Sequence, residues 1–379
     1  MSPNASTTRD LAWIKEQLQS AIELEFSTLP VYLSSMFSLE VQNYAVYNVI
    51  RSVAMEEMVH MAIAGNILAA LGGAPQIRNI RIHFPVKGLP GGAEPDLQVG
   101  LAQFSKKQLK KFLRIEMPDL LVKQVNRDET YPTIAKFYKA IRQAISDNAD
   151  AVRAAVKAGG PANQMGDDIG FTVIHDTPGV DSAKTICDAI DEILEQGEGA
   201  TTGNLITPNS DEYEESHYAK FASLYYGHCY QEPNPPVELS TQTESLFFKG
   251  LPIGWPEVIN TLAVPSDGYA KILALDPNAA AVTADLSAFD NDFSAVLLAL
   301  DQAWNGPAPV AWKTLGSAVH SMVDLRVLSC FNIVRHQIPA NLVTQLPELY
   351  PNEIEWMKDL TDLTKPVLYG PRFINANPL

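Results

Sequence analysis

Two Glu-x-x-His pairs carry the clearest chemical signal in this sequence: Glu57 with His60, and Glu214 with His217. Residues three apart on a helix share a face, so each pair can direct a carboxylate and an imidazole at one point. Carboxylate oxygen and imidazole nitrogen together suit divalent iron or manganese. One such pair is common by chance, whereas two form a sharper signal. The spacing therefore indicates a metal centre with ligands from two helices.

The phase of these residues on their helices supports a buried centre. A helix turns about 100° per residue, so each side chain can be assigned to a face. Glu57 and His60 fall inside an apolar stripe, from which Glu56 points away. Glu214 and His217 likewise share the apolar face of their own segment. A carboxylate on an apolar face is costly unless a cation compensates it, which favours metal binding.

Further carboxylates extend the candidate set. Glu25 lies within the apolar stripe of the first helical segment, and Tyr32, seven residues later, shares its face and is expected near the metals. Another segment ends in Glu195-Gln-Gly-Glu198-Gly, where Glu198 turns towards the apolar side if the helix continues past the preceding glycine. Glu195 is the alternative to Glu198. Glu116 is either a further carboxylate at the metals or only a helix cap.

This set of residues matches a known arrangement. Ferritin-like di-iron and di-manganese carboxylate proteins take one Glu from each of two helices and Glu-x-x-His from each of two others. We therefore predict an all-α fold, a ferritin-like four-helix bundle with long loop insertions and extra C-terminal helices, around two iron ions or, alternatively, manganese.

The elements that must position these residues follow from apolar periodicity. It predicts helices over 8–39, 43–71, 105–117, 132–147, 182–197, 211–229, 284–304 and 309–336. Pro30 should end or kink the first helix locally. Short strands are open alternatives at 77–84 and 171–174.

Three Pro- and Gly-rich connections interrupt these helices, at 72–104, 146–181 and 231–283. We expect residues 8–230 to form the bundle, with loop insertions at about 72–104 and 146–181. Residues 231–379 should add a Pro-rich connection, a C-terminal helix pair and, over 350–379, an irregular wrapping tail. We expect this second part to pack on the bundle as one unit.

Composition narrows the classes of partner. The 379 residues include 44 acidic and 28 basic side chains, a formal net charge of −16, which argues against nucleic acid or an anionic membrane surface as partner. No run of about 18 apolar residues is evident, so we expect no membrane-spanning helix. The polar start and the three scattered cysteines make the cytoplasm the expected compartment.

Several short motifs resemble the ferritin-like domain of the iminophenyl-pyruvate dimer synthase family. The motifs are Glu25-Phe-Ser-Thr-Leu-Pro-Val-Tyr32, Met55-Glu-Glu-Met-Val-His60, Leu71-Gly-Gly-Ala-Pro75, Leu89-Pro-Gly-Gly92, Glu195-Gln-Gly-Glu-Gly199, Glu215-Ser-His-Tyr218 and Gly370-Pro-Arg-Phe373. The resemblance runs from about residue 10 to 230 and implies a ferritin-like bundle with a dinuclear iron centre. The ligands that it implies are Glu25, Glu57, His60, Glu198 or Glu195, Glu214 and His217. Named members of that family are longer chains that couple two tryptophan-derived imines in bacterial indolocarbazole and violacein pathways.

The sequence thus leads to a functional hypothesis with rivals. The leading expectation is a dinuclear iron oxidase or oxygenase that uses O2 or peroxide on a small organic, amino-acid-derived substrate in specialised metabolism. The main alternatives are manganese-dependent peroxide disproportionation and a metal-free helical scaffold or binding module. Iron storage is disfavoured, because about 150 residues beyond residue 230 would obstruct cage assembly.

Overall fold

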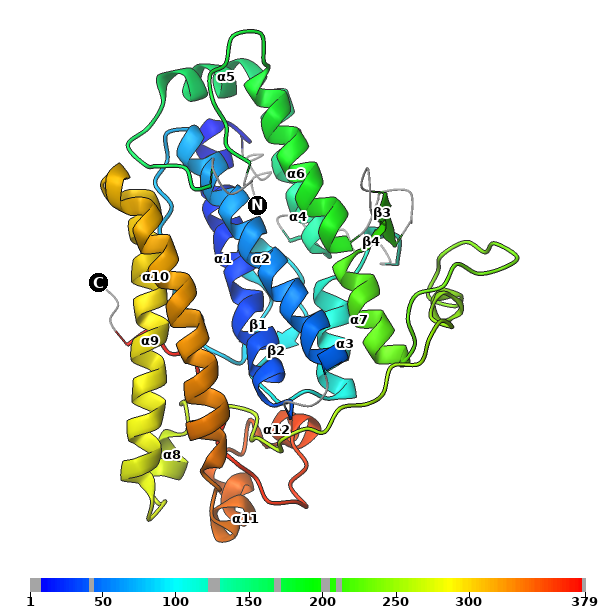
Figure 1. The fold of residues 1–379 in the computed structure, drawn as a ribbon, viewed down its shortest axis with the longest axis vertical. Helices are drawn as coiled ribbons and strands as arrows, with labels where there is room; N and C mark the ends of the chain where they lie inside the picture. Colours follow the sequence, from blue (N-terminus) through cyan, green and yellow to red (C-terminus); the bar gives the residue numbers. More distant parts are fainter. Residues whose placement is uncertain are drawn as a thin grey trace, which may run out of the picture.

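The computed structural model describes residues 8–40, 44–121, 130–166, 172–198, 205–208 and 213–376. Two long helices, α1 (Leu11–Phe37) and α2 (Tyr44–Ala70), pack against each other along the centre of the molecule (Figure 1). Asp10 caps α1, because its side chain accepts hydrogen bonds from the amides of Ala12 and Trp13. The helix continues through Pro30, so of the two predicted effects of Pro30 the end of the helix does not occur, and a local kink stays a prediction.

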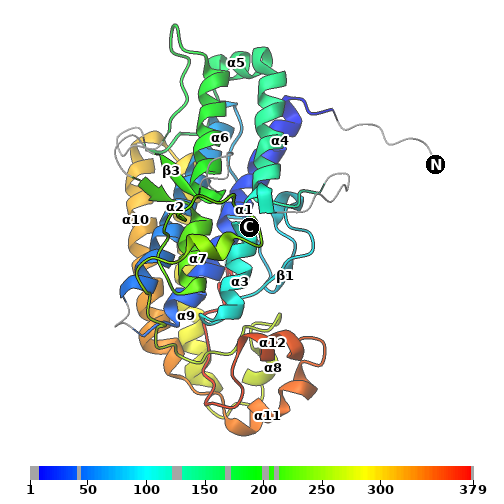
Figure 2. The same cartoon turned by 90° about the vertical axis from the view of Figure 1, so that its right-hand side faces the viewer.

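Four helical segments make the other half of the bundle, stacked in two columns. Helix α3 (Lys106–Ile115) lies below α4 (Ile134–Asp147), and α7 (His217–Tyr226) lies below α6 (Ser182–Glu198), in both views of Figures 1 and 2. The column of α3 and α4 packs against the column of α6 and α7. The third and fourth positions of the bundle are therefore each filled by a broken helix.

The breaks have local causes. Met117-Pro118 follows directly after α3, and proline lacks the amide hydrogen that would extend a helix. Ser216 caps the start of α7 by accepting a hydrogen bond from the amide of Ala219. Residues before this cap form a short strand, β4 (Tyr213–Glu215), which pairs antiparallel with β3 (Ile206–Pro208). The predicted helix over 211–229 is thus replaced by a strand and a shorter helix.

The predicted C-terminal helix pair is present and flanks the bundle. Helices α9 (Ala279–Asn305) and α10 (Ala308–Val327) pack together and lie beside α1 and α2 (Figure 1). Phe293 of α9 stacks on Phe26 of α1, with ring centroids 5.8 Å apart. Trp304 packs directly against Gly65 of α2. A Cβ atom added at Gly65 would lie 2.5 Å from the indole ring of Trp304.

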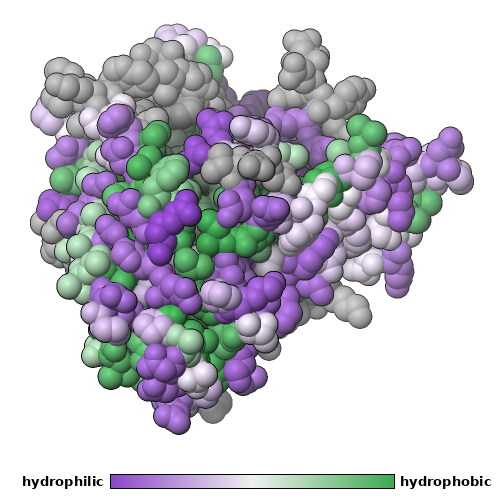
Figure 3. Space-filling view, turned by 60° about the horizontal axis from the view of Figure 1, so that its bottom comes forward, coloured by the Kyte–Doolittle hydropathy of each residue, from purple (hydrophilic) through white to green (hydrophobic). Residues whose placement is uncertain are grey.

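Short elements fill the connections and the lower end. Strands β1 (Val86–Lys87) and β2 (Gln98–Val99) pair within the first connection, whereas no strand forms at 77–84 or at the described part of 171–174. Helices that the periodicity did not predict are α5 (Ala149–Ala158), α8 (Ala270–Leu273), α11 (Ala340–Leu349) and α12 (Ile354–Leu360). On the face shown in Figure 3, hydrophobic and hydrophilic side chains are intermixed.

Helix α2 is long and apolar enough to cross a membrane by length and composition. However, 78% of its most apolar window is buried inside the protein, and the helix carries buried Glu57 and His60. The central helix of a bundle meets the same criterion, so the expected absence of a membrane span stays a prediction.

Candidate metal centre

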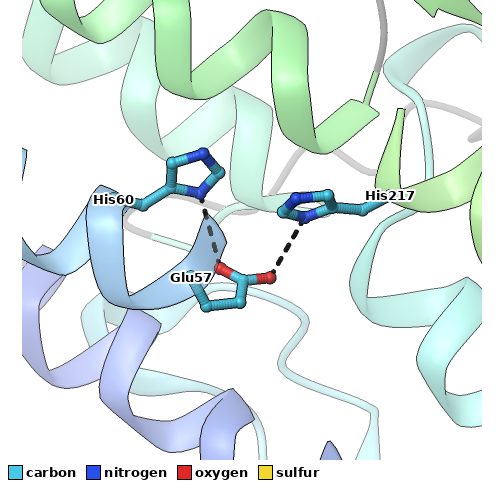
Figure 4. A group of neighbouring side chains, drawn as sticks. All are labelled: Glu57, His60 and His217. Atoms are coloured by element: carbon cyan, nitrogen blue, oxygen red, sulfur yellow. Dashed lines mark ion pairs between the residues drawn. The ribbon is translucent and has the colours of Figure 1, made fainter. Parts of the chain in front are cut away.

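Glu57 and His60 of α2 meet His217 of α7 in the middle of the bundle, where the two broken columns are interrupted. All three side chains are buried, and one potential ligand atom from each lies within 4.8 Å of the others. Nδ1 of His60 is 3.5 Å from Oε2 of Glu57, and Nδ1 of His217 is 3.2 Å from Oε1 (Figure 4). Glu57 thus lies between the two imidazoles.

Two further carboxylates complete the group. Oε2 of Glu25, from α1, is 4.0 Å from Nδ1 of His60. Oε2 of Glu116, which caps the C-terminal end of α3, is 3.5 Å from Nδ1 of His217. Both carboxylates are buried. The five side chains line a cavity of about 20 Å³, together with apolar residues of α4 and α6.

Two buried tyrosines donate hydrogen bonds to the carboxylates. The hydroxyl of Tyr32 donates to Oε1 of Glu116, and that of Tyr138 donates to Oε1 of Glu25. Burial and the neighbouring carboxylates raise the pKa of both tyrosines well above the usual range, so both hydroxyls keep their protons. The structure brings Tyr32 to the group, as expected, and adds Tyr138, which the sequence analysis missed.

A second layer holds the two imidazoles by their outer nitrogens. Nε2 of His60 lies 2.8 Å from Oε1 of Gln196, and Nε2 of His217 lies 2.8 Å from Oε2 of Glu56. Lys220 is 2.7 Å from both oxygens of Glu56. Burial would raise the pKa of Glu56, but His217 and Lys220 outweigh it and lower that pKa. Glu56 is therefore an ionised acceptor, which places a proton on Nε2 of His217.

Burial and mutual repulsion shape the charges inside the group. Burial and then the charge of Glu57 raise the pKa of Glu25 well above its usual range, and they raise that of Glu116 to about 7. Burial opposes ionisation of Glu57 as well, but His217 outweighs it and lowers the pKa of Glu57. Burial alone would lower the pKa of His217, whereas Glu57 raises it. Where no cation is bound, protons on these groups therefore neutralise part of the negative charge of the clustered carboxylates.

The group fits a metal ion by an independent criterion. Nδ1 of His217 is buried without a hydrogen-bond partner among the described residues, although carboxylates surround it. Its contacts with Glu57 and Glu116 are ion pairs without good hydrogen-bond geometry, and a metal ion between these groups would satisfy the nitrogen and both carboxylates. Since carboxylate and imidazole donors suit iron and manganese, Glu57, His60 and His217 can bind a metal, with Glu25 and Glu116 beside them.

Two predicted ligands, Glu214 and Glu195, are not part of this group, and the position of a third cannot be compared with it. Glu214 lies on strand β4 with 43% of its side chain exposed, and its carboxylate is 3.3 Å from Lys220. The helix begins only at His217, so Glu214 is not one helical turn before the histidine. Glu195 is exposed on α6. Glu198 is the last residue of α6, and its side chain lies outside the described residues.

Glu116 takes the place that was predicted for Glu214. Its carboxylate lies 3.5 Å from His217, although the sequence analysis left open whether it caps a helix or joins the metal site. In the structure Glu116 is the C-cap of α3, and its carboxylate lies beside the candidate metal group.

Comparison with known proteins agrees with this architecture. A solved structure of a ferritin-like protein from Caulobacter vibrioides matches with a TM-score of 0.56 and 19% sequence identity, covering 86% of this chain and 98% of that chain. No curated protein matches the chain. A family model described as Ferritin-like matches residues 18–226, which is more than half of the sequence. The predicted fold class is therefore confirmed, and the chain belongs to the ferritin-like family.

Proposed function

We propose that this protein is a non-haem dinuclear iron oxidoreductase that uses O2 or peroxide to oxidise a small organic substrate. The observation that carries the proposal is the convergence of two buried carboxylates on Nδ1 of His217, which lies 3.2 Å from Glu57 and 3.5 Å from Glu116 and makes no well-aligned hydrogen bond among the described residues. His60 presents its own Nδ1 to the other oxygen of Glu57.

The donor atoms divide naturally between two ions. Glu25 and His60 would hold one ion, and Glu116 and His217 the other. Glu57 would contact both, because its two oxygens face different imidazoles. Bound iron would supply the one-electron chemistry that O2 and peroxide require.

The protein's own groups would orient the ligands and manage protons. Tyr138 and Tyr32 hold Glu25 and Glu116 by hydrogen bonds, while Gln196 and Glu56 fix the two imidazoles. Apolar residues of α4 and α6, such as Ile134 and Leu194, line the cavity and limit water. Oε2 of Glu116, with its pKa of about 7, can hold or release a proton beside the reacting centre at neutral pH.

The choice of an organic substrate rests on motif resemblance. The stretches around Glu25, Glu57 and His217 look like those of the iminophenyl-pyruvate dimer synthase family. This supports an amino-acid-derived substrate in specialised metabolism.

A second candidate function is peroxide disproportionation, with manganese in place of iron. The cavity at the candidate centre measures about 20 Å³, enough for about one water-sized molecule. The described residues thus leave little room for an organic molecule beside the candidate ligands, which favours a substrate as small as peroxide.

Metal analysis and oxygen chemistry test the proposal together. Protein purified without chelators should contain about two equivalents of iron per chain, and reduced protein should consume O2. Glu57→Ala should lose the metal and keep its helical circular dichroism. Glu16→Ala, an exposed change on α1, should keep both.

The possible results separate the rival functions. Bound manganese with rapid evolution of O2 from peroxide would favour disproportionation. Less than about one equivalent of either metal, in wild type and Glu57→Ala alike, would leave only a scaffold or binding module and overturn the proposal.

A further inference from the structure

A second cavity lies beside α1 and has a volume of about 150 Å³. It is lined by Phe26 and Pro30 of α1, Phe293 of α9, the segment 80–84 and the tail residues 373–375. None of these residues lines the cavity at the candidate metal centre. The two cavities are therefore built from different side chains.

The wall of this second cavity is aromatic. Phe26 stacks on Phe293 with ring centroids 5.8 Å apart, and Phe373 meets Phe293 edge to face at 5.4 Å. Phe84 and Ile80, which also line the cavity, are buried. Aromatic rings pack favourably in stacked or edge-to-face arrangements. The wall therefore suits a planar ring.

The polar groups around the cavity leave its interior without a hydrogen-bonding site. Arg81 already has an interaction partner within the chain, and the side-chain amide of Asn375 donates to the carbonyl oxygen of Arg78 at 2.9 Å. His83 is exposed to solvent. Among the described residues, none of the buried side-chain atoms that lack a hydrogen-bond partner belongs to a residue that lines this cavity. A buried water molecule makes about two to four hydrogen bonds, so the interior suits an apolar occupant better than water.

The volume of the cavity matches that of one small ring. An apolar cavity of about 150 Å³ that is lined by Leu, Ile and Phe stays dry and binds benzene in other proteins. The cavity beside α1 has a similar volume. One benzene-sized group would therefore fill it.

The tail that forms one side of the cavity is fixed in place. Arg372 pairs with buried Asp290 through Nε and Nη2, both at 2.7 Å, and the amide of Ile374 donates to the same carboxylate at 3.2 Å. These contacts hold the backbone on both sides of Phe373. The cavity is thus preformed, which lowers the entropic cost of binding a ligand.

We propose that this cavity binds a small neutral aromatic molecule, with its ring against Phe26, Phe293 and Phe373. The aromatic wall selects the ring. The engaged polar side chains at the rim and the apolar interior select a ligand without charge, because burial of an uncompensated charge is costly. The site does not depend on bound metal, so the inference goes beyond the proposed function.

Fluorine NMR of the full-length protein with fluorobenzene tests the proposal. We expect a saturable change in the fluorine signal that unlabelled benzene reverses. Para-fluorobenzoate should bind no more tightly than fluorobenzene, since Arg81 is already engaged and a carboxylate loses hydration on burial.

Two variants change the cavity in opposite ways. Ile374→Trp, at a side chain that is 41% exposed, should fill the cavity and abolish binding. Phe293→Leu removes one ring of the wall and should weaken binding about two- to tenfold, because contacts between aromatic rings add to the effect of buried area. Circular dichroism checks that both variants are folded.

Matched controls connect the result to this cavity. Val323→Trp introduces the same indole at a side chain of α10 that is 57% exposed and does not line the cavity, so it should leave binding unchanged. Glu57→Ala should also bind fluorobenzene with unchanged affinity, so failure of the metal proposal would not affect this result.

Three results would overturn the proposal. The first is the absence of saturable fluorobenzene binding to the wild type. The second is tighter binding of para-fluorobenzoate than of fluorobenzene, which would show that the cavity selects an anion. The third is fluorobenzene binding that both Ile374→Trp and Phe293→Leu leave unchanged, which would place the ligand elsewhere.

Discussion

Nε2 of His217 donates a hydrogen bond to Glu56, 161 positions earlier in the chain, over 2.8 Å. Glu56 neighbours Glu57 but points off the metal-facing stripe of α2, and it reaches across to α7 instead. This contact leaves Nδ1 of His217 directed at Glu57 and Glu116. A carboxylate behind a ligating histidine fixes its tautomer and raises its basicity.

Removal of this contact should weaken metal binding. We expect Glu56→Ala to lower metal affinity about 10- to 100-fold, the usual effect of losing such a partner. Glu56→Gln keeps an acceptor oxygen and should recover part of the affinity. Competition with a chelator measures both variants. If Glu56→Ala binds metal as tightly as the exposed control Glu16→Ala, Glu56 does not position His217.

The correction of one ligand gives a direct test. Glu116→Gln should reduce the bound metal, because Glu116 lies 3.5 Å from His217. Glu214→Gln should bind nearly the full amount, because Glu214 is 43% exposed beside Lys220. Metal content after identical purification compares them. The reverse order would restore the original Glu-x-x-His interpretation.

Metal affinity should rise with pH. Burial and repulsion by Glu57 raise the pKa of Glu116 to about 7 and raise that of Glu25 well above its usual range. Near neutral pH the metal-free centre therefore holds protons that a metal ion must displace. Calorimetry in buffers of different ionisation enthalpy should detect proton release. Equal affinity at pH 6 and pH 8 would contradict this expectation.

The raised pKa of Glu116 also determines whether the stability of the metal-free protein rises or falls with pH. Between the ordinary pKa of 4.5 and about 7, Glu116 binds more protons in the folded state than in the unfolded state. The free energy of unfolding should therefore decrease as pH rises through this interval. Urea unfolding of metal-depleted protein measures it, and Glu116→Gln should flatten the dependence.

The buried ion pair of the tail should matter for stability. Asp290→Ala would leave Arg372 without its charge partner, and we expect a loss of about 3–5 kcal/mol in the free energy of unfolding. The double variant Asp290→Leu with Arg372→Met removes both charges and should lose clearly less. Denaturant unfolding of the two variants compares them. A double variant that is less stable than Asp290→Ala would contradict this account.

The sequence predicted the features that depend on local periodicity. Glu25, Glu57 and His60 are in the middle of long helices, where phase alone assigns a face. Glu214 was predicted to share a helical face with His217, but that prediction depended on where the helix starts. The helix starts after Ser216, a residue type that is favoured at the N-cap, so Glu214 lies outside it.

Other features depend on contacts between distant segments. Tyr138 reaches the centre only once α4 is packed, and nothing in its immediate sequence indicates it. Gln196 lies in a segment that was expected at the metals, but the residues predicted there were its neighbours Glu195 and Glu198. The short helices α5, α8 and α12 lie in stretches that were predicted to be connections or an irregular tail, and α11 lies between the last predicted helix and that tail. Their few turns give too little periodicity to outweigh nearby prolines and glycines.

The interrupted columns of the bundle have a further consequence. Glu116 closes α3 and His217 opens α7, whereas Glu25, Glu57 and His60 are within continuous helices. Bound ions would therefore act as a cross-link between helix ends that backbone hydrogen bonds leave separate. Hydrogen–deuterium exchange should slow at these ends on metal loading and change little in the centre of α1. Helices α1 and α2 would then be rigid before the ions bind, whereas the ends of α3 and α7 would become rigid only on binding.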